Sequence, residues 1–369
     1  MMEPIRVLHV LGRLDLGGAE SRIMDIYRKI DKSKVQFDFA IHTQDKCYFT
    51  DEVKSLGGKI YALPRFKGAN YFKYKQSWRR FFKNHRDEYR IVHGHQTSTG
   101  FVYLKEAKNN CVPVRIAHSR NSNKENLIKK HVCKLSKLYA THLFAVSKLA
   151  AISEFGLKTV EGGQAKILPN AIDAKKYSFN EETRKEKREE LGLKEEPLVI
   201  HIGRFHPQKN HEFLLDVFYE VLKLEPAAKL LLVGEGPLMD KVKQKISKLK
   251  IGGSVIVAGV RSDVPDLLQA ADTLLFPSFF EGLPGVVLEA QAAGLPCIVS
   301  DSITDEVMIT DLVRRVALTK SSSLWANRLV SSLKQGERKE TYREFVAKGY
   351  DINSVAKWYR HFYNSNVSG

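Results

Sequence analysis

The chain alternates short apolar runs with longer amphipathic stretches, and this alternation is regular through the first half. The apolar runs of this half have the length of strands. They cover Ile5–Leu11, Val35–His42, Lys59–Leu63, Arg90–His93, Val114–His118, Thr141–Val146 and Lys166–Leu168. Strands that alternate with helices predict a parallel sheet that is covered by helices on both faces.

A second alternation begins after the highly charged segment 180–197, which we interpret as a connection and a solvated helix. Its predicted strands are Leu198–Ile202, Lys229–Val233, Ser254–Ala258, Thr273–Phe276 and Cys297–Ser300, and its predicted helices lie near 210–224, 237–250, 264–271 and 285–293. The sequence therefore predicts an α/β fold with two Rossmann-like, doubly wound domains, at residues 1–176 and 177–349. Residues 350–369 carry one apolar face at helical spacing, which either packs on the second domain or crosses back to the first.

Length and composition agree with this division. The chain has 369 residues, 43% of them apolar, which is more than one ordinary core accommodates. The first apolar run, Val7–Leu11, is too short for a signal peptide, and no stretch reaches the roughly 18 apolar residues that a membrane span needs. Four scattered cysteines without paired spacing predict reduced, structural thiols. We therefore expect a cytoplasmic protein.

The net charge of +17 is unevenly distributed. Residues 1–176 contain 33 Lys and Arg against 16 Asp and Glu, whereas residues 177–369 contain 26 of each. A charge needed only for solubility would not segregate in this way, so the first domain is expected to meet an anionic partner. A membrane surface, a lipid-pyrophosphate substrate and nucleic acid all fit this charge, although no nucleic-acid recognition motif is visible.

Two strand ends in the second domain have the features of a phosphate site. In VIHIGRFHPQKN, Gly203 ends a strand, and Arg204 and Lys209 follow it at the start of a helix. Two cations with backbone donors suit a pyrophosphate. In LLLVGEGP, Gly234 would allow a ligand to approach the backbone closely, although a tight turn without a ligand explains it almost as well.

The most specific segment is FPSFFEGLPGVVLEAQAAGLP, residues 276–296. Glu281 precedes a helix that begins near Pro284, and Glu289 lies inside that helix. A carboxylate accepts hydrogen bonds from two vicinal hydroxyls, so Glu289 suits a ribose and Glu281 a transferred sugar. The amides of Gly282 and Leu283 would point at the phosphate.

This segment and the stretches LGGAE (16–20), RIAHSR (115–120), LPNAID (168–173) and GRFHPQKN resemble the family 4 retaining glycosyltransferases of GT-B architecture, near the bacterial exopolysaccharide and capsule enzymes. The resemblance covers essentially the whole chain. It implies two Rossmann-like domains facing across a cleft, with acceptor-side residues in the first domain and the nucleotide-sugar donor in the second.

The resemblance also implies a role for each matching residue. The implied catalytic residues are His118, Arg204, Lys209 and Glu281, and the implied donor-binding residues are Gly17, Gly18, Val260, Arg261 and Glu289. The residue patterns described above add Gly203, Gly234, Gly282 and Leu283 to the predicted donor-binding residues. Without the resemblance, His118 would also be a candidate for a buried core histidine. His93 and His95 are interpreted as structural or acceptor-side residues. After GLPCIVSD the chain departs from the family pattern, and Asp305 or Glu306 would replace the usual acid there.

The predicted reaction moves a hexose or N-acetylhexosamine from a nucleotide diphosphate sugar, with UDP as the expected nucleotide, to a lipid-linked saccharide. No D-x-D triplet occurs in the sequence, so we expect neither a metal nor any cofactor, the nucleotide sugar being a substrate. The resemblance implies retention of configuration and a polyprenyl-diphosphate-linked acceptor. A nucleotide-sugar 2-epimerase of the same fold and a basic nucleic-acid-binding protein remain the alternatives.

The amphipathic, cationic stretch Tyr71–Arg90 is open to two interpretations. Its basic residues and aromatic face suit the surface of an anionic membrane, which would place the protein at the inner face of the plasma membrane. A surface helix with its apolar side in the domain core has the same pattern.

Overall fold

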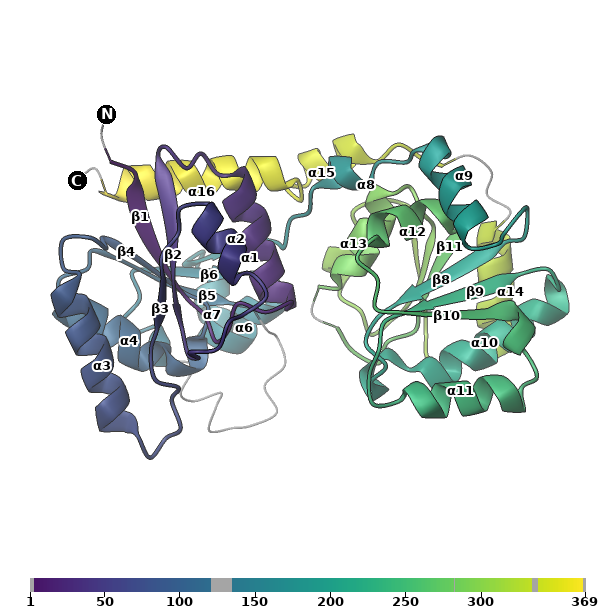
Figure 1. The fold of residues 1–369 in the computed structure, drawn as a ribbon, viewed down its shortest axis with the longest axis horizontal. Helices are drawn as coiled ribbons and strands as arrows, with labels where there is room; N and C mark the ends of the chain where they lie inside the picture. The colour runs from purple at the N-terminus through teal and green to yellow at the C-terminus, as the bar shows by residue number, and fades with distance from the viewer. Residues whose placement is uncertain (1–2, 121–134, 282, 334–337, 368–369) are drawn as a thin grey trace. The chain divides into compact units, whose positions relative to one another are not determined.

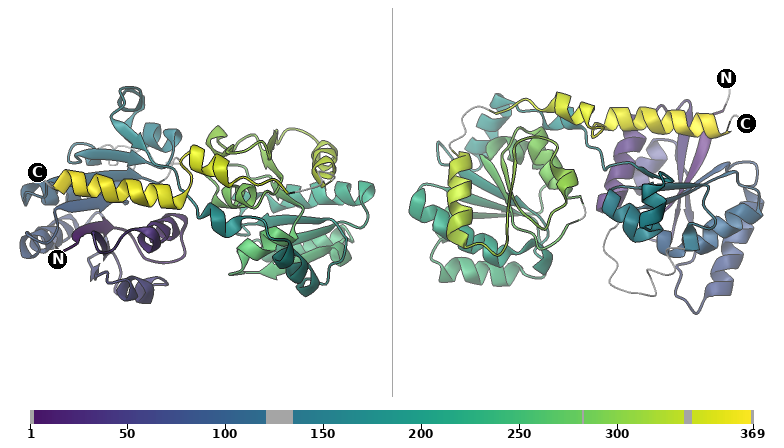
Figure 2. Two further views of the ribbon diagram at one scale, coloured as in Figure 1. Left: turned by 90° about the horizontal axis from the view of Figure 1, so that it is seen from above. Right: turned by 180° about the vertical axis from the view of Figure 1, so that it is seen from behind.

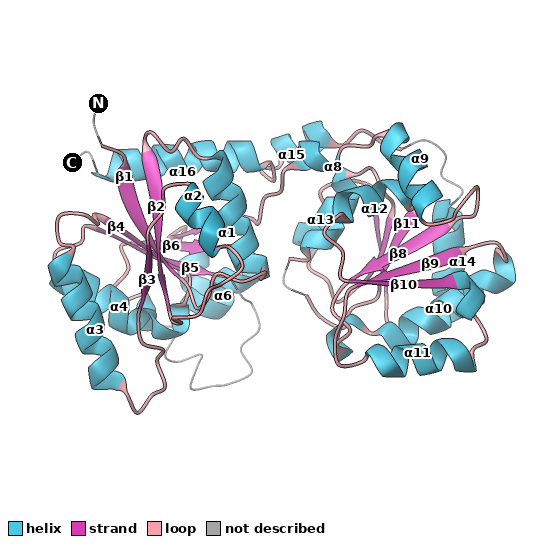
Figure 3. Ribbon diagram, viewed as in Figure 1, coloured by secondary structure: helices cyan, strands magenta, loops and turns pink. Residues whose placement is uncertain are grey.

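The computed structural model describes residues 3–120, 135–281, 283–333 and 338–367, which form two compact units (Figure 1). The first unit comprises residues 1–171 and 349–369, and the second comprises residues 172–348. In each unit, helices flank a central parallel sheet on both faces (Figure 3). The predicted pair of doubly wound α/β sheets is thereby confirmed.

The first unit is built on a seven-stranded sheet in the order β3-β2-β1-β4-β5-β6-β7. The strands are β1 (Ile5–Val10), β2 (Val35–Ile41), β3 (Ile60–Ala62), β4 (Ile91–Gly94), β5 (Val114–Ser119), β6 (His142–Ala145) and β7 (Ala165–Ile167). The order reverses between β1 and β4, which are neighbours although β2 and β3 separate them in sequence. In open parallel sheets, ligands bind beyond the carboxyl ends of the strands at such a point.

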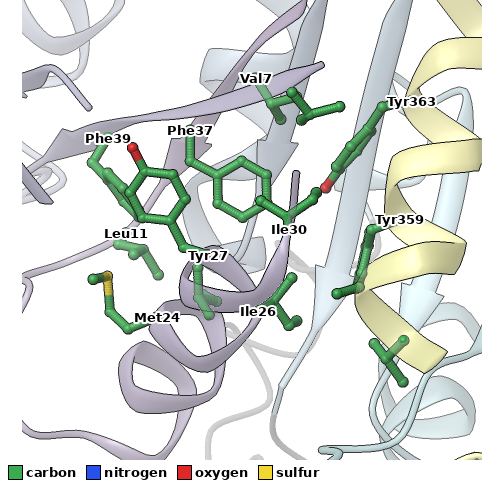
Figure 4. Close-up of a cluster of buried hydrophobic side chains, with 14 of the residues drawn as sticks. Val7, Leu11, Met24, Ile26, Tyr27, Ile30, Phe37, Phe39, Tyr359 and Tyr363 are labelled. Carbon is green, nitrogen blue, oxygen red and sulfur yellow. The ribbon is translucent and has the colours of Figure 1, made fainter. Parts of the chain in front are cut away.

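Helices cover both faces of this sheet. They are α1 (Gly18–Lys29), α2 (Thr50–Ser55), α3 (Tyr71–Asn84), α4 (Thr97–Asn109), α6 (Lys148–Phe155), α7 (Leu157–Glu161) and α16 (Ile352–Val367). Because successive side chains of a strand point to opposite faces, Val7 of β1 joins one apolar cluster and Leu8 joins the other. Figure 4 shows the first of these clusters, between the sheet, α1 and α16.

The closing helix α16 belongs to the first unit, although the whole second unit precedes it in the chain. It packs beside α1 and against β1 and β2 (Figure 2). Tyr359 and Tyr363 are its buried aromatic residues in this cluster, at 2% and 0% exposure. The apolar face seen in the sequence is therefore used to complete the core of the first unit.

The second unit contains a six-stranded parallel sheet in the order β10-β9-β8-β11-β12-β13. The strands are β8 (Leu198–Ile202), β9 (Lys229–Val233), β10 (Val255–Gly259), β11 (Thr273–Phe276), β12 (Cys297–Ser300) and β13 (Val313–Val316). The helices are α8 (Ala174–Tyr177), α9 (Glu181–Glu190), α10 (His211–Leu224), α11 (Met239–Lys248), α12 (Val264–Ala270), α13 (Gly285–Ala292), α14 (Ser322–Leu333) and α15 (Tyr342–Ala347).

Strand β13 is absent from the sequence-based prediction. It lies at the edge of the sheet and has the sequence VRRV, with both arginines exposed. Such a strand has neither an apolar run nor an alternating pattern, so only its pairing with β12 identifies it.

The helix in the cationic stretch is α3, which ends at Asn84 rather than continuing to Arg90. Its apolar residues Tyr74, Trp78, Phe81 and Phe82 are buried in the second apolar cluster of the first unit. The aromatic face therefore packs in the core, and the basic residues lie on the solvent side. None of the helices in the described ranges is long and apolar enough to cross a membrane.

Candidate active site

The predicted phosphate site lies where β8 ends. After Gly203 the chain forms a short 3-10 turn, Pro207–Lys209, and then enters α10 at His211. Asn210 joins the turn to the helix with a left-handed backbone, at φ 55°. This turn places Lys209 directly before a helix of 14 residues.

Hydrogen bonds fasten the turn to the segment that follows β11. The Gln208 side-chain amide donates to the carbonyl of Phe280 at 2.9 Å, and the Phe279 amide donates to the carbonyl of Gln208 at 2.9 Å. The Asn210 amide donates to the carbonyl of Pro277 at 3.2 Å. Two strand ends that are distant in sequence are thus held together as one surface.

The result of this fastening is an ion pair between Lys209 and Glu281. The Lys209 Nζ lies 2.6 Å from Glu281 Oε1, and the two side chains are only 17% and 11% exposed. The same ammonium lies 4.5 Å from the centre of the Phe276 ring. The sequence predicted both residues for the site but not that they pair, because their spacing along the chain does not show the loop contact.

Two glycines bring the ends of β8 and β9 close together. The Gly203 amide donates to the carbonyl of Val233 at 2.9 Å, and the Gly234 amide donates to the carbonyl of Gly259 at 2.7 Å. Gly234 has a φ of +133°, and a Cβ there would lie 2.2 Å from the Gly203 carbonyl oxygen. Gly234 is therefore needed for the close contact between two strand ends of the protein itself, and the predicted approach of a ligand stays a prediction.

The other residues of the predicted donor site are placed as follows. The Arg204 side chain is exposed and, in the described part of the chain, has no carboxylate partner. Leu283 is half-buried just before α13, and Glu289 lies within that helix. Gly282 lies outside the described residues.

Val260 and Arg261 follow β10. Val260 is 66% exposed, so a flat ligand such as a base could pack against its side chain. The Arg261 guanidinium is held by Asp263 at 2.6 Å and by Glu190 at 2.7 Å. The hydrogen bond from Arg261 is the main reason why the pKa of the Asp263 carboxyl lies well below its usual range. Arg261 is thus fixed by protein carboxylates.

Of the acids that would replace the usual family residue, Asp305 pairs with Arg315 of β13. Asp305 and Glu306 lie in the short turn Asp305–Val307, where Thr304 caps the Glu306 amide at 3.3 Å. The ion pair of the Asp305 carboxylate is thus with Arg315, and that of Lys209 is with Glu281.

The predicted residues of the first unit lie at the carboxyl ends of its central strands. Gly17 caps α1 with an extended backbone, and Gly18 is the first residue of that helix. A Cβ at Gly18 would meet nothing within 4 Å, and Gly18 begins a 12-residue helix with a positive amino-terminal end, in whose first turn Glu20 also lies. This environment is compatible with an anionic ligand.

His118 is the last histidine of a buried cluster. His9 of β1 and His93 of β4 are direct neighbours in the strand register, His95 follows β4, and His118 lies in β5. All four lie on the face of the sheet that α1 and α16 cover, and none is more than 8% exposed. His118 is therefore a buried histidine, as one interpretation of the sequence had it, and its place at the reacting centre stays a prediction.

The four imidazoles form two hydrogen-bonded pairs. His9 Nδ1 lies 3.0 Å from His95 Nε2, and His93 Nε2 lies 2.9 Å from His118 Nδ1. Arg120 donates from Nε to His95 Nδ1 at 3.3 Å, and the Tyr363 hydroxyl lies 2.8 Å from His93 Nδ1. Burial lowers the pKa of His9 to about 3 and that of His93, His95 and His118 well below 6.5, and the nearby Arg120 adds to the shift. These histidines are neutral at physiological pH.

The cluster also contains three nitrogen ligands that would suit a metal, since one atom each of His9, His93 and His95 lies within 4.8 Å of the others. The ring geometry favours hydrogen bonds instead. The His9 and His95 rings are 6° from parallel with centroids 5.3 Å apart, which places them edge to edge with their nitrogens facing each other. A lone pair aimed at a neighbouring N–H is not available to a cation, and Arg120 adds a positive charge beside it.

Sequence reasoning did not single out His9, Arg120 or Tyr363. The available signal was that three predicted strands, those of VLHVL, IVHGH and RIAHS, each carry a histidine at or near the carboxyl end. Parallel strands present their carboxyl ends at one edge. The strand order that makes β1, β4 and β5 neighbours was not known from the sequence, and neither was the packing of α16.

Comparison with known proteins agrees with this architecture. Residues 183–351 match the family described as glycosyl transferases group 1. The chain is 34% identical over 371 residues to the putative glycosyltransferase EpsF of Bacillus subtilis, covering 97% of this chain and 96% of the relative. It is 32% identical over 233 residues to an Escherichia coli enzyme named UDP-Gal:alpha-D-GlcNAc-diphosphoundecaprenol alpha-1,3-galactosyltransferase, covering 58% of this chain and 59% of that one.

Solved structures share the fold at low sequence identity. The Anabaena protein Alr3699/HepE, crystallised with UDP, has a TM-score of 0.75 at 16% identity and matches 99% of this chain and 98% of its own. Residue pattern, paired parallel sheets and a full-length relative lead to the same assignment. The chain belongs to the group 1 glycosyltransferases, the family 4 enzymes of GT-B architecture, and is related to bacterial enzymes of exopolysaccharide and capsule synthesis.

Proposed function

We propose that this glycosyltransferase moves a hexose or N-acetylhexosamine from a UDP-sugar to a polyprenyl-diphosphate-linked saccharide during surface polysaccharide synthesis. The observation that carries the proposal is the Lys209–Glu281 pair, which fixes a cation and a carboxylate at the carboxyl edge of the second sheet. The Escherichia coli relative, whose name gives a UDP-galactose donor and a diphosphoundecaprenol-linked acceptor, supports this choice of substrates.

Arg204 and Lys209 stabilise the leaving diphosphate in this proposal. Negative charge develops on the nucleotide diphosphate as the glycosidic bond to the donor breaks, and fixed cations lower the energy of that state without a metal ion. Arg204 is exposed and has no protein carboxylate to compete for it among the described residues, so a diphosphate can recruit it. Glu281, oriented by Lys209, accepts hydrogen bonds from the sugar hydroxyls, and Glu289 does the same for the ribose.

Transfer proceeds with retention of configuration in this proposal. The acceptor attacks from the face that the diphosphate leaves, and a diphosphate oxygen takes the acceptor proton. The neutral histidines of the first unit support this route, because their low pKa makes them poor bases near pH 7. Trapping a covalent glycosyl-enzyme would contradict it.

A nucleotide panel tests the donor. UDP and UDP-sugars are expected to raise the melting temperature of the purified protein, with smaller shifts for GDP and ADP, because a ligand that binds only the folded state stabilises it. The Lys209→Ala variant is expected to lose this shift. If no nucleotide diphosphate stabilises the protein, the proposed donor is wrong.

A turnover assay tests the reaction. Free UDP should be released only when a polyprenyl-diphosphate sugar is supplied, and release should persist in EDTA because the proposed mechanism uses no metal. Interconversion of sugar epimers without an acceptor would instead identify a 2-epimerase.

We further propose that the protein associates peripherally with the inner face of the plasma membrane through the basic side of α3. Lys73, Arg79, Arg80 and Lys83 of this helix and Arg86 just after it are exposed, four aromatic residues of the helix are buried, and Phe72 at its start is 82% exposed. Contact with a bilayer would then be mainly electrostatic, with Phe72 as the exposed aromatic side chain that could enter the interface.

Vesicle binding tests this contact. The Arg79→Glu/Arg80→Glu variant is expected to lose binding to phosphatidylglycerol vesicles at low salt. The matched control is Lys241→Glu/Lys243→Glu, which changes two exposed lysines of α11 in the second unit. Equal binding by both variants would show that α3 is not the contact.

A further inference from the structure

The feature that the proposed function leaves unexplained is the buried histidine cluster with its two anchors, Arg120 and Tyr363. The two imidazole pairs are arranged in layers. His93 and His95 are stacked with ring centroids 4.3 Å apart, and each forms an edge-to-edge hydrogen bond with its own partner, His118 or His9. In this arrangement each hydrogen bond also determines which ring nitrogen of a histidine carries the proton.

The direction of the first chain of hydrogen bonds is fixed by Arg120, which can only donate. His95 Nδ1 accepts from Arg120, so the single proton of neutral His95 is on Nε2. That nitrogen donates to His9 Nδ1, and the proton of His9 is therefore on Nε2. His9 Nε2 has no partner among the described residues, and the surrounding pocket has no room for a water molecule.

The second chain begins at Tyr363. Burial raises the pKa of the Tyr363 phenol well above 10, so its hydroxyl keeps a proton to donate. An unprotonated imidazole nitrogen is a stronger hydrogen-bond acceptor than a phenol oxygen, so His93 accepts and Tyr363 donates. Donation to His93 Nδ1 leaves the His93 proton on Nε2, which donates to His118 Nδ1. The proton of His118 is then on Nε2, a buried atom without a hydrogen-bond partner in the described ranges.

We propose that Tyr363 is a positioning residue that acts through His93 to hold His118 as an Nε2–H hydrogen-bond donor for a substrate oxygen. An unpartnered buried N–H is unfavourable, and a hydrogen bond to a substrate oxygen would remove that penalty. The role assigned to His118 rests on the proposed function, whereas the ordering of its proton by Tyr363 is a property of the free protein.

Tyr363 lies at the end of the chain, 270 residues from His93. Figure 4 shows its ring reaching from α16 toward Phe37 and Ile30 of the first unit. Its neighbour Tyr359, one helical turn earlier, is equally buried and stacks on it at 5.6 Å. The contacts of the Tyr359 side chain are ring contacts, to His93 and Phe144 among others, and no hydrogen bond joins its hydroxyl to a histidine of the cluster. Tyr359→Phe is therefore the matched control for Tyr363→Phe.

Nitrogen-15 NMR of histidine-labelled protein measures the tautomer directly and needs no substrate. In the unsubstituted protein His118 should be a single Nε2–H tautomer, assigned by the signal missing from His118→Gln. Tyr363→Phe should convert it to a mixture, because His93 can then take its proton on Nδ1 and accept from His118. Tyr359→Phe should leave it unchanged. An unchanged His118 tautomer in Tyr363→Phe overturns the proposal.

Kinetics give the second readout. Tyr363→Phe should lower kcat about tenfold, the equivalent of one net hydrogen bond, and leave the KM for the nucleotide sugar unchanged. In a His118→Gln background the same change should have no further effect, because Tyr363 acts through His118. Equal kcat values for the two tyrosine variants, or additive losses in the double variant, would overturn the positioning role. If no transfer activity is found at all, the proposed function fails while the tautomer measurement still decides the proton order.

Discussion

At the scale of single residues, the second unit pairs the Lys209 ammonium with the Glu281 carboxylate and leaves both partly accessible to solvent. Lys209 and Glu281 are more exposed than a core ion pair and far less exposed than the surface pairs of this chain. A partly buried pair of this kind is oriented by the protein and still accessible to a ligand. The ammonium has more than one donor proton, so binding to a diphosphate does not require it to leave Glu281.

Lys209→Ala is expected to lower kcat/KM about 100-fold or more, because it removes a fixed charge from the developing diphosphate. Steady-state kinetics with the donor checks this. The matched control is Lys223→Ala, which breaks a pair with Glu220 of the same 2.6 Å length on a more exposed part of the unit. A similar loss in both variants would indicate a general effect of charge.

Gly234→Ala is expected to destabilise the second unit and weaken nucleotide binding. A Cβ would lie 2.2 Å from a backbone oxygen, which cannot move aside as a flexible side chain could, and the φ of +133° is strained for alanine. The strain alone is worth about 1–3 kcal/mol. Gly253→Ala is the control, because a Cβ there meets nothing within 4 Å. Urea unfolding of both variants makes the comparison, and equal midpoints would contradict the prediction.

At the scale of elements, Asp38 joins the first three strands of the chain. It lies in β2 and is fully buried, with Arg6 of β1 donating twice at 2.6 Å, the Lys59 amide donating at 2.6 Å and the Tyr89 hydroxyl at 2.8 Å. Removing the charge leaves the Arg6 guanidinium with Glu88, 3.7 Å away, as its carboxylate partner among the described residues.

Asp38→Asn is therefore expected to destabilise the first unit by about 3 kcal/mol, the lower end of the cost of breaking a buried pair, because Asp38 is buried while Arg6 is 22% exposed and keeps Glu88 nearby. The urea midpoint measured by fluorescence of Trp78, which is buried in the same unit, reports the change. Asp51→Asn breaks the exposed pair with Lys46 and should leave the midpoint unchanged. A small effect at Asp38 would mean that water or a rearranged Arg6 replaces the lost contact.

The elements also show what the sequence can and cannot predict. Strands such as β2 and β11 are buried along their whole length, so their apolar runs identify them, whereas VRRV of β13 has no such run. Gly203, Arg204, Lys209 and Glu281 come from local motifs and were found without the fold. The bond from Tyr363 to His93 joins residues 270 positions apart and depends on strand order and on α16, which no local pattern encodes.

At the scale of the whole molecule, buried neutral histidines are unevenly distributed between the two units. His9, His93, His95 and His118 belong to the first unit, and His201 and His211 to the second. Burial lowers the pKa of all six, to about 3 for His9 and to about 4 for His211. Unfolding restores a pKa near 6.5, so the unfolded chain binds more protons below that pH.

The first unit should therefore lose stability faster than the second as pH falls from about 6.5 to 5, before most carboxylates titrate. Each histidine that stays neutral in the folded state lowers the free energy of unfolding by about 2 kcal/mol at pH 5, because only the unfolded imidazole binds a proton there, and this loss is absent above the unfolded pKa. Urea unfolding at pH 7.5, 6 and 5 measures the effect. A Trp325→Phe variant reports only the first unit, through Trp78 and Trp358, and a Trp78→Phe/Trp358→Phe variant reports only the second. A free energy of unfolding for the first unit that is flat across this range would mean that the cluster takes up protons while folded, and the neutral proton order assigned to His93 and His118 would then be wrong.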